Sequence, residues 1–61
     1  MTYLTGFAEA CYEQNSIAEL KSCQRQRAAD KTDCAEWSIT PTEWRAAIAE
    51  ALAEKLADLG I

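Results

Sequence analysis

The sequence predicts a small all-α domain of three helices, in which an antiparallel helical hairpin packs against a long C-terminal helix. Two patterns lead to this prediction. Helix-start and helix-stop residues bracket positions 40–60, and apolar residues recur at spacings of three and four before position 30. The length of 61 residues suits one domain, so we expect a single helical domain over 1–61.

Residues 40–59 carry the clearest helix signal. Thr40 is a favoured N-cap residue, Pro41 suits the first helical position, and Glu43 stands where a capping box needs an acceptor. Gly60 follows the last apolar residue, where a left-handed C-cap residue is expected. Start and stop signals therefore agree on one long helix.

The apolar residues of this helix cover about half of its circumference, which is wider than the stripe of an ordinary surface helix. The bulky side consists of Ile48, Leu52, Leu56 and Leu59. The small side consists of Ala46, Ala49, Ala53 and Ala57. Because short side chains allow close helix approach, the small side is a candidate self-association face of a homodimer. The alternative is that other helices of the same chain cover it.

Residues 1–14 predict the first helix of the hairpin, with one face formed by Leu4, Phe7, Ala8, Cys11 and Tyr12. Thr2 or Thr5 is a candidate cap, but Gly6 weakens the first turn, so the helix is also expected to begin only after it.

The second helix is expected over 16–29. Ser16 and Glu19 have capping-box spacing, and so little chain separates the two helices that an antiparallel hairpin is favoured over one bent helix. Its apolar stripe is narrow, so it must lean on its neighbours.

The connector 30–39 is expected to contain a short helical turn capped by Asp30 or Thr32. A tryptophan is too large to leave in water. We expect the connector to close one end of the core with its apolar residues and one from the long helix: Trp37, Ile39 and Trp44.

Composition limits the functions that are expected. The formal net charge of −4 disfavours general nucleic-acid binding. The chain has no histidine and no Cys-x-x-Cys pair, so we expect neither a metal nor a cofactor. No apolar run approaches a membrane span and no signal peptide is evident, so we expect a cytoplasmic protein.

The three cysteines, Cys11, Cys23 and Cys34, are expected to be small core residues. Pairing of the first two helices as a hairpin would bring no two of them together, so we do not expect a disulfide. The only candidate nucleophile is Cys23, whose basic neighbours Lys21, Arg25 and Arg27 suggest a lowered thiol pKa. Without histidine or another evident base, no catalytic constellation forms. We therefore expect a protein that is not an enzyme.

The function expected is that of a protein-interaction or regulatory module. A candidate acidic face for a basic partner runs along the long helix: Glu43, Glu50, Glu54 and Asp58. A sharper hypothesis is an inhibitor of phage or mobile-element type, in which these carboxylates mimic nucleic-acid phosphates. The alternative is a dimeric nucleic-acid-binding protein that uses the basic second helix through Lys21, Gln24, Arg25 and Arg27.

Overall fold

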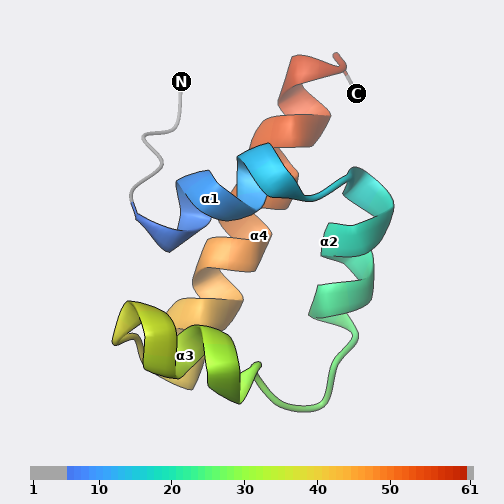
Figure 1. Ribbon diagram of the computed structural model, residues 1–61. Coiled ribbons are helices and arrows are strands. Elements are labelled where there is room, and N and C mark those ends of the chain that lie inside the picture. The colour runs from blue at the N-terminus through green and yellow to red at the C-terminus, as the bar shows by residue number, and fades with distance from the viewer. Residues whose placement is uncertain (1–5, 61) are drawn as a thin grey trace.

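The computed structural model describes residues 6–60, and this part of the chain folds into helices with no strand (Figure 1). The four helices are α1 (Phe7–Gln14), α2 (Ile17–Gln24), α3 (Lys31–Trp37) and α4 (Pro41–Asp58). The predicted all-α class is confirmed, but the short connector forms a helix of its own.

The long helix α4 is the spine of the fold. Helices α1 and α2 both pack along it, and α3 lies beside its N-terminal end (Figure 1). The predicted antiparallel hairpin is therefore only approximate, because α1 and α2 contact α4 far more than each other. The reason is the narrow apolar stripe of α2, whose one buried residue, Leu20, is used in the core formed with α4.

The predicted start of α4 is confirmed. The hydroxyl of Thr40 accepts a hydrogen bond from the backbone N–H of Glu43 at 3.1 Å, and a carboxylate oxygen of Glu43 accepts from the N–H of Thr40 at 2.8 Å. These bonds satisfy two backbone donors that a helix start leaves free. Gly60 takes the expected left-handed conformation, with φ of 74°.

The same device starts α2, where Ser16 and Glu19 exchange hydrogen bonds of 3.2 and 2.8 Å. The helix ends at Gln24, however, well before the predicted position 29. Beyond it, Arg45 of α4 donates hydrogen bonds from Nη2 to the carbonyls of Gln26 at 2.9 Å and Arg27 at 2.7 Å. These carbonyls are held by α4 instead of continuing the helix.

Helix α3 is capped by Asp30, one of the two predicted candidates, whose Oδ1 accepts from the N–H of Asp33 at 3.0 Å. The helix ends at Trp37, and its C-cap, Ser38, has a left-handed φ of 54°. The N–H of Ile39 then reaches back to the carbonyl of Cys34 at 3.0 Å. This left-handed turn directs the chain into α4.

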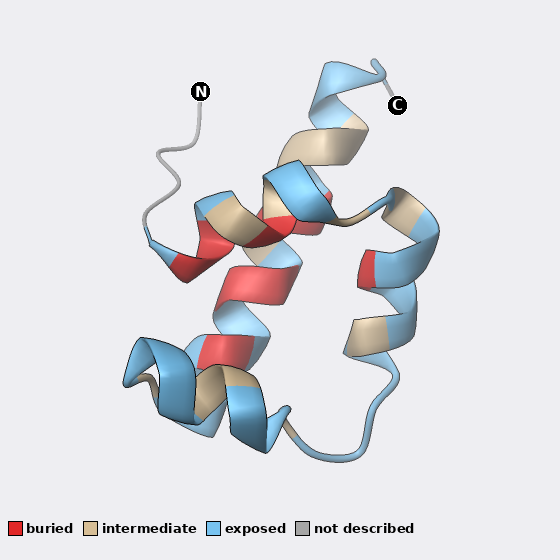
Figure 2. Ribbon diagram, viewed as in Figure 1, coloured by how far each residue is buried: buried red, intermediate tan, exposed pale blue. Residues whose placement is uncertain are grey.

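The core lies where α1 and α2 meet α4 (Figure 2). Its buried residues are Phe7, Ala8, Cys11, Leu20, Trp44, Ala47, Ile48, Ala51 and Leu52. The bulky side predicted for α4 faces this core through Ile48 and Leu52, with Leu56 packed at its edge. Leu59 is instead 62% exposed, and Ala47 and Ala51, which the prediction had left out, join the core. Ala47 and Ala51 present only methyl groups to the core, and such short side chains allow a neighbouring helix to approach closely.

Helix α1 begins at Phe7, immediately after Gly6. This is the later of the two starts that the sequence predicted. Gly6 has a φ of 50°, a left-handed value that favours glycine. The predicted caps Thr2 and Thr5, and the predicted core residue Leu4, lie outside the described residues. Within residues 6–60, no helix combines the length and the apolar character that crossing a bilayer requires.

Candidate functional site

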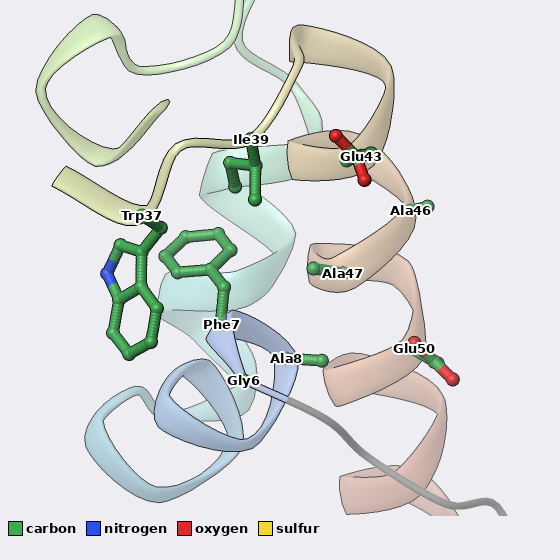
Figure 3. A pocket seen from close by; sticks show the side chains of 9 residues that line it. All are labelled: Gly6, Phe7, Ala8, Trp37, Ile39, Glu43, Ala46, Ala47 and Glu50. Carbon is green, nitrogen blue, oxygen red and sulfur yellow. The ribbon is translucent and has the colours of Figure 1, made fainter. Parts of the chain in front are cut away.

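The strongest candidate site is a surface hollow of about 360 Å³ between the start of α1, the end of α3 and the first half of α4 (Figure 3). We call it the aromatic hollow. Its lining residues are Gly6, Phe7, Ala8, Trp37, Ile39, Glu43, Ala46, Ala47 and Glu50. The volume lies at the lower end of the range of ligand pockets, so it suits an anchoring side chain better than a large ligand.

Two aromatic rings form one wall of this hollow. Phe7 and Trp37 lie with ring centroids 5.7 Å apart and planes inclined by 53°, a tilted pair of the favoured kind. Phe7 lies between Trp37 and α4 in Figure 3. Phe7 is buried, whereas Trp37 remains 41% exposed.

The prediction that Trp37 closes the core with Ile39 and Trp44 was therefore wrong for Trp37. Trp44 takes the core position, with 1% exposure, and Ile39 packs against the core from its edge. Trp37 stands at the last position of α3. The left-handed turn at Ser38 follows at once, so this indole covers Phe7 from outside.

The rim of the aromatic hollow carries two carboxylates, Glu43 and Glu50, and no basic side chain lines it among residues 6–60. Glu43 is held in place by its capping hydrogen bond with Thr40. A carboxylate has about four acceptor positions, so this bond leaves most of its capacity free. Glu50 is half-buried and points outward from α4 (Figure 3). The hollow thus combines apolar walls with negative charge at the edge.

The other two members of the predicted acidic face, Glu54 and Asp58, do not line this hollow. Asp58 accepts a hydrogen bond from the hydroxyl of Tyr12, which raises the pKa of that tyrosine. Lys55 lies over the same ring, with Nζ 4.8 Å from the centroid. Glu54 is half-buried and does not line the aromatic hollow. The four carboxylates therefore do not all border one hollow.

A second hollow near Tyr12, of about 420 Å³, lies at the other end of α4. It is lined by Tyr12, Ser16, Ile17, Ala18, Lys55, Asp58 and Leu59. Its charges have both signs, so they select neither an acidic nor a basic ligand.

All four residues of the candidate self-association face are exposed: Ala46, Ala49, Ala53 and Ala57. The chain's own described helices therefore leave this face open. Ala46 also lines the aromatic hollow, which joins the small side of α4 to the aromatic wall.

The cysteines come together more than the sequence predicted, because Cys11 and Cys23 line the same hollow of about 290 Å³. All three cysteines are free thiols. Burial raises the pKa of the Cys11 thiol to about 11, with further contributions from Asp33 and Cys23. The pKa of Cys23 is also raised, by burial and then by Asp33, Glu19 and Asp30.

The suggested lowering of the Cys23 pKa by its basic neighbours was therefore wrong. Burial and the negative charges of Asp33, Glu19 and Asp30 raise this pKa, although bases are the near neighbours in sequence. A raised pKa keeps the thiol protonated near neutral pH, and the thiolate is the nucleophilic form. The arrangement does not activate Cys23 for chemistry.

The candidate nucleic-acid residues are all exposed but do not share one helix: Lys21, Gln24, Arg25 and Arg27. Lys21 and Gln24 belong to α2, Arg25 is its C-cap, and Arg27 lies in the following loop. Among residues 6–60, no group of acidic, cysteine or histidine side chains is arranged to hold a metal ion.

Comparison of the chain with protein families, curated proteins and solved structures found no match. Sequence reasoning found the two glutamates but missed the aromatic wall. Two features of the sequence hinted at this wall: Trp37 follows a short capped segment, and Gly6 stands immediately before Phe7. Only the fold brings Phe7 and Trp37 together.

Proposed function

We propose that this protein is a small non-catalytic interaction module that holds an apolar, positively charged segment of another protein in the aromatic hollow. One observation carries the proposal: exposed Trp37 and the carboxylates of Glu43 and Glu50 border a single hollow, and none of the described residues that line it is basic. Exposed tryptophans beside small pockets are typical anchors of protein interfaces.

The charge of the hollow supports a basic partner. An apolar segment that also carries Lys or Arg would bury its apolar side chains against Phe7 and pair its charges with the rim. An acidic segment would meet two like charges, which disfavours association. The net charge of −4 steers encounters in the same direction.

A second copy of the chain is a weaker candidate for the hollow. A two-fold interface places the same patch of both copies together, so Glu43 and Glu50 would face their counterparts. Self-association through the exposed alanines of α4 stays a prediction. It concerns Ala49 and Ala53, which are exposed but do not line the hollow. The nucleic-acid alternative has less support, because α2 ends before Arg25 and Arg27.

A role without catalysis is supported by the raised pKa values of Cys11 and Cys23. The inhibitor hypothesis depends on one continuous acidic face, and Asp58 is instead engaged by Tyr12. The proposed partner is therefore defined by the hollow, not by the whole acidic row.

The test compares variants of a tagged chain in capture of partners from cells in which the chain is expressed. The double variant Glu43→Gln with Glu50→Gln removes both rim charges, and the glutamine at 43 can still accept the capping hydrogen bond. The matched control is Glu9→Gln with Glu54→Gln, which makes the same charge change outside the hollow. Circular dichroism confirms that both variants remain folded.

We expect a basic protein that is retained by the wild type and by the control, and lost by the rim variant and by Trp37→Ala. Equal retention by all variants would overturn the proposal. Capture of a nucleic acid in place of a protein would also overturn it. A dimer that light scattering detects for the wild type but not for the rim variant would overturn it too, because the hollow would then hold a second copy.

A further inference from the structure

We infer that the segment bound in the aromatic hollow is an α-helix that lies along α4 and carries two basic residues seven positions apart. This inference rests on the proposed function and adds the conformation and charge spacing of the partner. It follows from the spacing of the two rim carboxylates along α4.

Glu43 and Glu50 are separated by seven residues within one continuous helix. At the α-helical rise, this spacing is about 10.5 Å along the axis, and seven residues make nearly two full turns. The two carboxylates therefore project from nearly the same side of α4. Between them, Ala46 and Ala47 present only methyl groups. A partner lying along this surface thus meets two negative charges about two turns of α4 apart. Only the short alanine side chains lie between them.

A helix fits this pattern and an extended strand does not. Residues seven apart on a partner helix also share one side and are also about 10.5 Å apart. In a strand, side chains on one face recur about every 6.7 Å. Two basic residues on that face would therefore be about 6.7 or 13.4 Å apart, and neither distance matches the spacing of about 10.5 Å between the two glutamates. Strand addition also requires an exposed sheet edge, and residues 6–60 form no sheet.

The wall opposite the two glutamates supplies the apolar anchor site. Phe7 and Trp37 stand there as a tilted pair, and Trp37 is exposed enough to contact a bound side chain. Among the described residues, no atom lies within 4 Å of the position that a β-carbon of Gly6 would take, so this part of the chain leaves the hollow open beside Gly6. A leucine or similar side chain midway between the two bases of the partner would enter here.

The rim is also partly preorganised. Glu43 is fixed by its hydrogen bond with the N–H of Thr40, and Glu50 is half-buried, so neither loses the full rotamer freedom of an exposed glutamate on binding. Fixed charges favour a partner with a fixed spacing, which a helix provides and a flexible segment does not.

The experiment uses two synthetic helical peptides of identical composition as probes. Each has a central leucine, and arginines stand either at positions i and i+7 or at i and i+5. The i+5 arrangement turns the second arginine to another side of the helix. Binding to the full chain is measured by calorimetry and by tryptophan fluorescence, in which Trp37 at the hollow changes its surroundings and buried Trp44 contributes a background.

We expect the i+7 peptide to bind about threefold more tightly, a difference of about 0.7 kcal/mol, which lies in the range of one exposed ion pair. The preference should vanish in Glu50→Gln and persist in the matched variant Glu54→Gln. Equal binding of both peptides, still weakened by Trp37→Ala, would overturn the helical spacing and leave the proposed function standing. If neither peptide binds at about 1 mM, where the binding free energy is only about −4 kcal/mol, both are overturned.

Discussion

The indole nitrogen of Trp44 donates a hydrogen bond to Oδ2 of Asp33 at 3.1 Å. Trp44 is 1% exposed and belongs to α4, whereas Asp33 belongs to α3. A buried indole N–H needs an acceptor, and the short helix α3 supplies one. This bond fixes α3 over the core and so positions Trp37, which ends the same helix beside the aromatic hollow.

Replacing Asp33 by Ala is expected to destabilise the fold by about 1–3 kcal/mol, because it leaves the buried N–H of Trp44 without a partner. Asp33→Asn keeps an acceptor in the same place and should cost less. Urea unfolding followed by tryptophan fluorescence measures both free energies. Equal stability of Asp33→Ala and the wild type would show that the hydrogen bond does not hold α3 in solution.

Ser38→Gly is expected to stabilise the protein by about 1 kcal/mol, because a left-handed conformation is strained for residues other than glycine. The φ of Ser38 is 54°. The matched control is Ser22→Gly in the exposed part of α2, where glycine should destabilise by about 0.5–1 kcal/mol. Thermal melting of both variants gives the two signs, and a loss of stability in both would contradict the turn at Ser38.

Leu52→Asp is expected to abolish cooperative unfolding, since it places a charge in the core, where an unpaired ion is very costly. Leu52 is buried against the other core residues. The next residue, Ala53, is exposed, so Ala53→Asp makes the same charge change outside the core and should melt nearly as the wild type does. Circular dichroism during heating separates the two, and similar melting of both variants would contradict the placement of α4.

Stability is expected to fall as the pH rises above about 9, in part through Cys11. The pKa of this thiol rises from 9.0 to about 11 on folding because it is buried. The unfolded chain therefore ionises first, so this contribution is complete below pH 9 and is lost as the pH approaches 11.

The check is urea unfolding from pH 8 to 11 (a range of about three units around the shift), with reductant present. Cys11→Ala should start less stable, because it loses buried sulfur, and should then decline less steeply with pH. Parallel declines for Cys11→Ala and the wild type would show that the thiol does not carry this dependence.

Much of the local structure could be read from the sequence. The capping boxes of Thr40 with Glu43 and of Ser16 with Glu19 form as predicted, and Gly60 ends the last helix region in a left-handed conformation. These features depend on residues three or four positions apart, whose side chains reach the neighbouring backbone in any helical context. Local chemistry alone therefore determines where these helices begin.

The arrangement of the helices and the site were decided by tertiary packing. The sequence offered a bulky and a small apolar side of α4, and the core combines Ile48 and Leu52 of the bulky side with Ala47 and Ala51, which belonged to neither side. The same choice left Leu59 and Trp37 at the surface.

The aromatic hollow follows from that choice, since it joins Phe7, Trp37 and Glu50 from three helices. Periodicity states which residues share a face of one helix, but not which faces of different helices meet. That outcome depends on the shape of all the packed surfaces together, so the acidic rim could be anticipated from the sequence and its aromatic wall could not.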